Sequence, residues 1–309
     1  MFFGVGEKTS PVATGARIQR IPVMAKVSRP DTEGETEIHR TVSDDGTEIA
    51  GGVHGQGPPL VLVHGGPHDG DLAWESLVPH LTNQYTCYLP SIRGRGLSAD
   101  SPDLSPPRLQ EDITAFVDSI GEPVGLVGWS AVEWTLGAIE NSDTVAAVAL
   151  YEPNISSLMG EDDLALLGAA REEGGAALAD DRPADASRAL HRYVCTDLEF
   201  AALGDTYFDR CAALLPKVLP AFEQAESYEG PLATDPDQLG KITEPVLILR
   251  GQKTLLNAFV ADSAKHVAEH AGDSRIHELP GLGHFAPLVE PEPIAEELIN
   301  FFESVPSLT

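Results

Sequence analysis

Short apolar runs recur along this chain and alternate with stretches in which apolar residues return every three or four positions. The second kind of spacing places apolar side chains on one face of a helix, as at residues 109–120 and 294–302. Helices that alternate with strands are typical of a mostly parallel sheet covered by helices on both faces. We therefore predict an α/β fold with strands at residues 59–63, 85–89, 124–127, 145–151, 246–249 and 275–279.

Two further features divide the chain around this predicted core. The pair Asp45-Gly46, between residues 37–43 and 48–54, predicts a β-hairpin before the first parallel strand. Between Pro153 and Gly240 the apolar strands stop, and short helical stretches rich in Ala, Leu, Asp and Glu replace them. We predict three parts: a weakly ordered extension at residues 1–36, a core at 37–153 and 241–309, and a helical cap insertion at 154–240.

A serine stands where one of the buried strands is predicted to turn into a helix. The strand that begins at Val124 runs into Gly128-Trp129-Ser130-Ala131. A side chain on such a sharp turn is held above the sheet edge, exposed to substrate and close to a helix N-terminus. A serine that only caps the helix would give the same local pattern. Ser130 is therefore a candidate nucleophile whose role depends on a second residue.

His284 is the candidate for that second residue. It lies in Gly281-Leu282-Gly283-His284, after the last predicted strand and before the closing helix. A serine hydroxyl is a weak nucleophile, and a neighbouring imidazole must take its proton. Because the carboxyl ends of parallel strands meet at one edge, Ser130 and His284 are predicted to lie close together. We infer that His284 is the general base, the alternative being a solvated loop histidine.

With these residues in view, the chain resembles the α/β-hydrolase superfamily over about residues 37–303. The resemblance implies an α/β-hydrolase fold: a mostly parallel central sheet, helices on both faces and a helical cap insertion. It also implies an oxyanion hole made by the backbone N–H groups of Gly66 and Ala131. Haloalkane dehalogenases and epoxide hydrolases of this fold carry a carboxylate at the position of Ser130, so the serine sets this chain apart from them. The motifs that carry the resemblance are, in order, His64-Gly65-Gly66-Pro67, Arg93-Gly94-Arg95-Gly96-Leu97-Ser98, Gly128-Trp129-Ser130 and Gly281-Leu282-Gly283-His284.

The acid of the triad is assigned by the same resemblance. Many family members carry it a few residues after the strand that is here 246–249, but residues 250–257 contain no carboxylate. Some haloalkane dehalogenases instead carry a Glu directly after the strand that follows the elbow helix. Here that strand is 145–151, and Glu152 follows it. The resemblance therefore implies that Glu152 accepts the His284 Nδ1 hydrogen bond, with Asp262 as the weaker alternative.

The elbow departs from the usual Gly-x-Ser-x-Gly pattern of the family. Val132 and Glu133 stand where glycines are common, and glycine lets the helix pack closely against the strand. We therefore expect a slightly displaced helix or a reshaped neighbour, with an effect on turnover. Ser91 stands two residues before Arg93, where the family often has an acidic residue, and we expect this change to alter loop packing rather than chemistry.

The charge of the chain excludes several partners. Its formal net charge is −28, and a field of that sign repels nucleic acid and anionic lipid surfaces. The acidic residues are dispersed rather than gathered in one tail, which favours a surface kept hydrated in high salt over an acidic patch for a cationic partner. We therefore hypothesise that the protein is halophilic.

The remaining composition predicts a cytoplasmic protein. The three cysteines are odd in number and form no Cys-x-x-Cys, which favours reduced, buried thiols over disulfides or a zinc ribbon. No apolar run approaches the roughly 20 residues that span a bilayer, and residues 1–3 are too few for a signal-peptide core.

Together these features predict a serine hydrolase of the carboxylic ester hydrolase class. It would cleave a carboxylic ester, thioester or lactone of a small molecule through an acyl-enzyme, with no cofactor. Trp129, His68 and Phe285 are expected to line the substrate pocket. Two alternatives stay open: an amidase of the proline-iminopeptidase type, which residues 64–67 resemble, and a low-turnover ligand-binding or signal-receptor protein, which the altered elbow favours. The oligomeric state is also open, and no metal site is expected at the i, i+4 histidine pairs His64/His68 and His266/His270.

Overall fold

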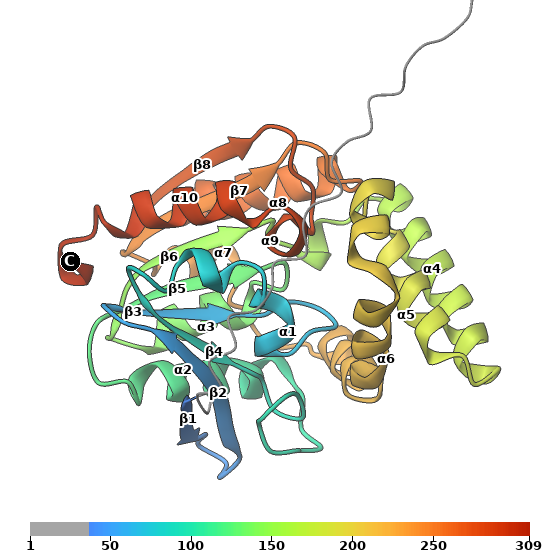
Figure 1. Ribbon diagram of the computed structural model, residues 1–309, viewed down its shortest axis with the longest axis horizontal. Helices are drawn as coiled ribbons and strands as arrows, with labels where there is room; N and C mark the ends of the chain where they lie inside the picture. The colour runs from blue at the N-terminus through green and yellow to red at the C-terminus, as the bar shows by residue number, and fades with distance from the viewer. Residues whose placement is uncertain (1–36) are drawn as a thin grey trace, which may run out of the picture. The chain divides into compact units, whose positions relative to one another are not determined.

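An eight-stranded sheet forms the centre of the computed structural model, which describes residues 37–309. The weak order predicted for residues 1–36 lies outside the described residues. The sheet order is β1-β2-β4-β3-β5-β6-β7-β8, with β1–β2 and β2–β4 antiparallel and all later pairs parallel (Figure 1). The strands are β1 Glu37–Val42, β2 Glu48–Gly55, β3 Pro59–Val63, β4 Thr86–Pro90, β5 Val124–Trp129, β6 Val145–Tyr151, β7 Pro245–Gly251 and β8 Asp273–Leu279.

Helices cover both faces of this sheet, and strand β3 shows why. Its side chains alternate: Leu60 and Leu62 join the apolar cluster that includes α1 and α10, while Val61 and Val63 join the cluster that includes α2 and α3. All five β3 residues are buried, as expected for a strand between two helical layers. The helices are α1 Gly70–Trp74, α2 Pro106–Asp118, α3 Glu133–Asn141, α4 Glu161–Ala179, α5 Pro183–Arg192, α6 Asp197–Ser227, α7 Pro236–Leu239, α8 Asn257–His270, α9 Ala286–Val289 and α10 Pro291–Phe302.

Four helices, α4 to α7, occupy the stretch between β6 and β7, and the first three, α4, α5 and α6, make up the cap. These three helices pack on one another beside one edge of the sheet layers (Figure 1). Helix α6 is bent at Gly204, whose φ of 72° and ψ of 174° lie outside the helical region. Its first half reaches back to the core, where α6 contacts α9. The cap therefore comes close to the loop that carries His284.

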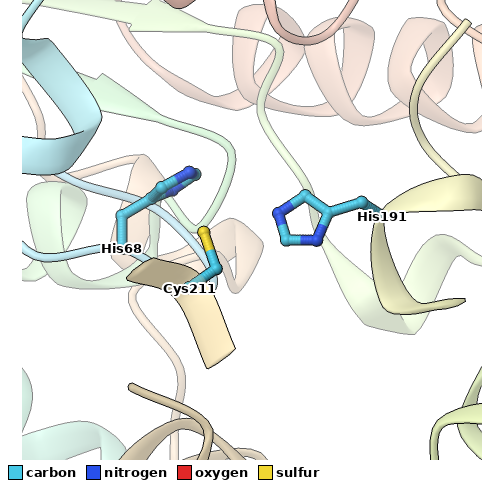
Figure 2. A group of neighbouring side chains, drawn as sticks. All are labelled: His68, His191 and Cys211. Carbon is cyan, nitrogen blue, oxygen red and sulfur yellow. The ribbon is translucent and has the colours of Figure 1, made fainter. Parts of the chain in front are cut away.

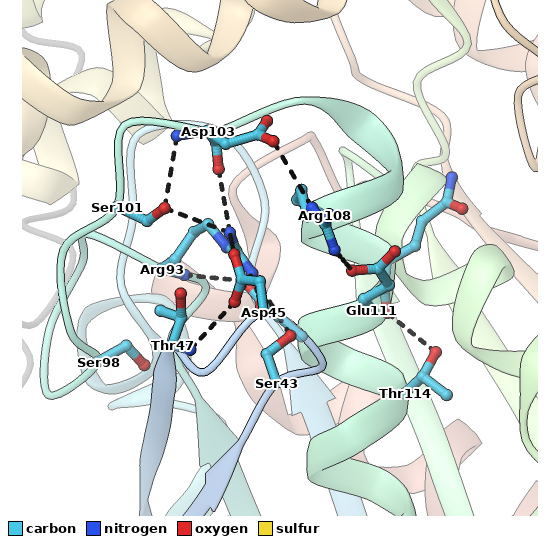
Figure 3. A network of polar contacts seen from close by, with 12 residues as sticks. Ser43, Asp45, Thr47, Arg93, Ser98, Ser101, Asp103, Arg108, Glu111 and Thr114 are labelled. Carbon is cyan, nitrogen blue, oxygen red and sulfur yellow. Dashed lines mark hydrogen bonds and ion pairs between the residues drawn. The ribbon is translucent and has the colours of Figure 1, made fainter.

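A buried ionic network fixes the loop after β4. The Arg93 guanidinium donates to Asp45 Oδ2 at 2.6 Å (Figure 3). It also donates to Asp112 Oδ1 at 2.7 Å, and the side chains of Arg93 and Asp112 are fully buried. Asp45 belongs to the β1–β2 turn and Asp112 to α2. The hydrogen bond between Asp45 and Arg93 holds the pKa of Asp45 well below the usual range. Two acids distant in sequence thus balance Arg93, although Ser91 replaces the acid expected just before it.

Within residues 37–309, no helix combines the length and the apolar character that crossing a bilayer requires.

Candidate active site

Ser130 sits on a strained turn between β5 and α3. Its φ is 62°, a region that non-glycine residues rarely adopt. The turn is held by backbone hydrogen bonds: Ser130 N–H donates to the Tyr151 carbonyl at 3.0 Å, and the Ser130 carbonyl accepts from Asn154 N–H at 2.8 Å. Gly65 is required beside it, because a Cβ there would lie 2.3 Å from the Trp129 carbonyl oxygen. The packing therefore holds the Ser130 side chain at the carboxyl end of β5.

The structure brings the three sequence-predicted triad residues together. Ser130 Oγ lies 3.1 Å from His284 Nε2, and His284 Nδ1 lies 3.3 Å from Glu152 Oε2. Glu152 is fully buried, and its carboxylate also accepts from Gly251 N–H at 2.6 Å and from Thr254 Oγ1 at 2.5 Å. Three groups thus orient one carboxylate: Gly251 N–H, the Thr254 hydroxyl and the His284 ring. This arrangement fits a nucleophile, a base and an acid that orients the base.

The alternative acid, Asp262, lies elsewhere. It is exposed on α8, and the hydrogen-bond partner of His284 Nδ1 is Glu152. An exposed carboxylate that does not contact the imidazole cannot fix the imidazole tautomer. It also cannot stabilise the imidazolium strongly, because water screens the carboxylate charge. The geometry therefore favours Glu152 over Asp262.

The two candidate oxyanion donors come from different loops: Gly66 lies in the loop after β3, and Ala131 directly follows Ser130 in the turn after β5. Gly66, Ala131 and Ser130 line the same cavity. Among residues 37–309, neither the Gly66 nor the Ala131 backbone N–H donates to a protein acceptor. Arg95, which is buried, fixes the loop after β3 by donating through Nη1 to the carbonyls of Gly66 and His68. Both N–H groups are therefore available to a substrate oxygen.

The cavity around Ser130 has a volume of about 310 Å³ and is mostly apolar. The three residues predicted to line the pocket, Trp129, His68 and Phe285, all lie in its wall. Trp129 is also structural, since its indole Nε1 donates to the His284 carbonyl at 3.0 Å. The apolar wall comes from the core and the cap alike, including Leu109, Trp134, Met159, Leu190, Val194 and Phe222.

Val132 and Glu133, the two departures in the elbow, have defined places. Val132 is fully buried with a φ of −76°, which a valine adopts without strain. Glu133 accepts from Ala233 N–H at 2.5 Å and from Thr234 Oγ1 at 2.9 Å, and burial raises its pKa. Its carboxylate thus ties the elbow helix to the chain that returns from the cap, and its hydrogen bonds are not made to Ser130 or His284.

Glu199 is a site residue that sequence reasoning missed. It is buried on α6, where its Oε1 accepts from Phe285 N–H at 2.6 Å and its Oε2 accepts from Thr196 N–H at 2.8 Å. A Cβ on Gly283 would lie 2.5 Å from the same carboxylate, so a larger residue there would have to displace Glu199 from its hydrogen bonds. A cap residue therefore positions the loop that carries His284. The pattern Thr196-x-x-Glu199 predicts a helix cap but gives no sign of this second contact.

Three of the four histidines in the two i, i+4 pairs, His64, His266 and His270, bond to the backbone, whereas His68 bonds to the side chain of Tyr207. His64 Nδ1 lies 3.0 Å from the Gly65 carbonyl, and His64 Nε2 accepts from Ile92 N–H at 3.2 Å. His266 Nε2 lies 2.9 Å from the Thr234 carbonyl, and His270 Nδ1 lies 2.8 Å from that of His266. These contacts hold the rings of His64, His266 and His270 against nearby backbone.

The fold defines the class of protein: the predicted α/β-hydrolase fold is confirmed. The family model described as "Alpha/beta hydrolase family" matches residues 60–297. The chain therefore belongs to the alpha/beta hydrolase family. Among solved structures, an alpha/beta hydrolase from Sphaerobacter thermophilus is 25% identical with a TM-score of 0.65, covering 85% of this chain and 100% of its own.

Two curated relatives match shorter stretches. Pyrrolizixenacetamide deacetylase from Xenorhabdus hominickii is 34% identical over 104 residues, which are 33% of this chain and 36% of that protein. Pimeloyl-[acyl-carrier protein] methyl ester esterase from Aeromonas hydrophila is 38% identical over 78 residues, which are 25% of this chain and 29% of that protein. The matched stretches thus span about a third of each relative.

Proposed function

We propose that this protein is a serine hydrolase that cleaves a carboxylic ester, thioester or lactone of a small molecule. The observation that carries the proposal is the continuous contact from Ser130 Oγ to His284 Nε2 at 3.1 Å and from His284 Nδ1 to Glu152 at 3.3 Å. The cavity around Ser130 suits a small, partly apolar substrate because its wall is mostly apolar. Two relatives whose names describe a methyl ester esterase and a deacetylase support acyl chemistry.

The reaction begins when Ser130 Oγ attacks the carbonyl carbon and His284 Nε2 takes the hydroxyl proton. The backbone N–H groups of Gly66 and Ala131 donate to the oxygen that becomes negative, each worth roughly 3–4 kcal/mol in the transition state. Glu152 stabilises the imidazolium, which then protonates the leaving alcohol, thiol or lactone oxygen. His284 then deprotonates a water molecule that attacks the acyl-enzyme, and it gives this proton to Ser130 Oγ as the acid product leaves.

Cleavage of an amide is the second candidate function. It is favoured by the relative named as a deacetylase of an acetamide. The same serine, base and oxyanion donors serve amide cleavage, which additionally demands protonation of a poor leaving group. Release of an amine from an acetamide faster than release of an alcohol from the matched acetate ester would favour this candidate.

Labelling with a fluorophosphonate tests the proposed nucleophile. We expect the wild-type protein in high salt to be labelled and Ser130→Ala to remain unlabelled, because the probe phosphonylates only an activated serine. Mass spectrometry of the labelled peptide should place the adduct on Ser130. A folded wild-type protein that takes up no label would instead favour the ligand-binding or receptor alternative.

We further propose that the protein is halophilic, which the net charge of −28 supports. At about 3 M KCl the Debye length falls below about 3 Å and repulsion among surface carboxylates is screened, whereas at about 0.1 M it extends to about 10 Å. We expect the midpoint of thermal unfolding to rise by about 10 °C or more between these salt concentrations. Sucrose, which is also excluded from protein surfaces but does not screen charge, serves as the control. An equal rise in sucrose, or none in KCl, would contradict the proposal.

A further inference from the structure

Four buried polar side chains from the core and the cap meet beside the catalytic serine. His68 follows the oxyanion loop, His191 lies in α5, and Tyr207 and Cys211 lie in α6. Tyr207 Oη is 2.6 Å from His68 Nε2 and 3.0 Å from His191 Nε2. Figure 2 shows the two imidazole rings turned toward each other with the Cys211 sulfur beside them. His68 and His191 both line the cavity that contains Ser130.

Two imidazoles and a thiol are also a donor set that zinc accepts, and the ligand atoms of His68, His191 and Cys211 lie within 4.8 Å of one another. The hydroxyl of Tyr207, however, already lies at hydrogen-bond distance from both Nε2 atoms. Because His191 Nδ1 already bonds to the Ser187 carbonyl, a zinc ion would need His191 Nε2 at about 2.0–2.1 Å and would break its hydrogen bond with Tyr207. The geometry therefore fits a hydrogen-bonded chain better than an ion site.

The donor and acceptor roles in this series of hydrogen bonds follow from the residue at one end of it, His191. His191 Nδ1 lies 2.7 Å from the Ser187 carbonyl, which can only accept, so Nδ1 carries the proton. Burial lowers the pKa of His191 to about 4, so its ring is neutral at pH 7 and Nε2 is an acceptor. Tyr207 must then donate its hydroxyl proton to His191. The Tyr207 oxygen is left to accept from His68 Nε2–H.

This chain fixes the tautomer of His68. Burial also holds the pKa of His68 well below its ordinary value, so this ring too is neutral. With its proton on Nε2, His68 presents a lone pair at Nδ1. Nδ1 has no hydrogen-bond partner among residues 37–309 and is closed off from the cavity, so a donor reaches it only when the surrounding side chains shift. The ring itself is held in place by stacking on Trp129, with centroids 4.8 Å apart.

A buried acceptor without a partner is costly, and a ligand that donates to it recovers that cost. We propose that His68 Nδ1 accepts a hydrogen bond from the substrate, and that the substrate class is an acyl compound bearing a hydroxyl or N–H group near the scissile carbonyl. This inference rests on the proposed function, since it names the substrate class of the same site. Tyr207 and His191 are positioning residues in it, because they act through the tautomer of His68.

Binding to the inactive Ser130→Ala protein tests the inference without depending on turnover. Two pairs of ligands are compared. Each pair is a short-chain ester that bears a hydroxyl group and the same ester with that hydroxyl converted to a methyl ether, which keeps the oxygen but cannot donate. The group lies on the acyl part in one pair and on the alcohol part in the other. Calorimetry should give at least one hydroxyl ester a dissociation constant about tenfold or more below that of its ether. Adding His68→Phe, which keeps an aromatic ring on Trp129, should abolish the preference. Adding Tyr207→Phe should weaken it, because the tautomer is no longer fixed.

Cys211→Ala is the matched control, because the Cys211 thiol contacts Tyr207 but takes no part in the hydrogen bonds between Tyr207 and the two histidines. We expect it to keep the preference, and a chelator to leave the preference unchanged. The inference would be overturned if, in both pairs, the hydroxyl ester and its methyl ether bound equally well. It would also be overturned if the preference for the hydroxyl ester survived His68→Phe. A preference lost both in Cys211→Ala and on chelation would overturn it in favour of a metal site. Fluorophosphonate labelling of the wild-type protein reports separately on the proposed function.

Discussion

Replacing Ser130 or His284 by alanine is expected to lower kcat for a p-nitrophenyl ester about 10⁵-fold or more, and replacing both is expected to cost no more than replacing either. The reason is that the two side chains work as one unit. Without His284 the Ser130 hydroxyl keeps its proton and is a poor nucleophile, and without Ser130 the imidazole has no proton to take. Initial rates of the two single variants and the double variant, measured at saturating ester in high salt, give the comparison.

The residual rate should remain above that of the uncatalysed reaction, because the Gly66 and Ala131 N–H groups do not depend on either side chain. Circular dichroism and the thermal midpoint show whether each variant is folded. Additive losses, with the double variant far below both singles, would mean that Ser130 and His284 act in separate steps. A Ser130→Ala variant with near-normal turnover would remove Ser130 from the mechanism.

The fold could be predicted from sequence because its strands are recognisable from local sequence patterns. Strands β3, β5 and β7 are continuous apolar runs stopped by Gly or polar residues, and a run of that kind fits a strand buried on both faces. The alternation with amphipathic helices predicts a mostly parallel sheet, which the structure confirms. Ser130 and His284 followed from the same logic, because both stand at carboxyl ends of predicted strands. Their roles stay predictions, although the structure places their side chains 3.1 Å apart.

Contacts between the cap and the core could not be predicted in this way. Glu199 and Phe285 are 86 positions apart in the chain, and no periodic pattern links them. The same holds for Glu133 with Ala233 and for His68 with Tyr207, which are 100 and 139 positions apart. Each pair meets only because the helices between β6 and β7 return to the sheet edge. Local patterns report which side chains are buried, but the partner of a buried polar group depends on tertiary packing.

Glu152→Gln is expected to lower kcat about 10³–10⁴-fold while leaving the fold intact. The structure gives the reason. Gly251 N–H donates to one carboxylate oxygen of Glu152, and His284 Nδ1 faces the other. In the amide, the oxygen must serve Gly251, so the NH₂ group is turned toward His284. A donor at that place favours the tautomer with the proton on Nε2, and such an imidazole cannot accept the Ser130 proton.

Asp262→Asn is the matched control, because it removes the charge of the competing acid from an exposed place on α8. We expect it to change kcat less than about twofold, since exposed charges are screened by water and salt. The loss in Glu152→Gln should appear in kcat rather than in KM, because the carboxylate acts on His284 and not on the bound ester. If Glu152→Gln kept its turnover and Asp262→Asn lost it, the acid would have to reach His284 from α8. That movement would require breaking the hydrogen bonds of Glu152 to Gly251 and Thr254, and the loop after β7 would then be the part of the site that rearranges when substrate binds.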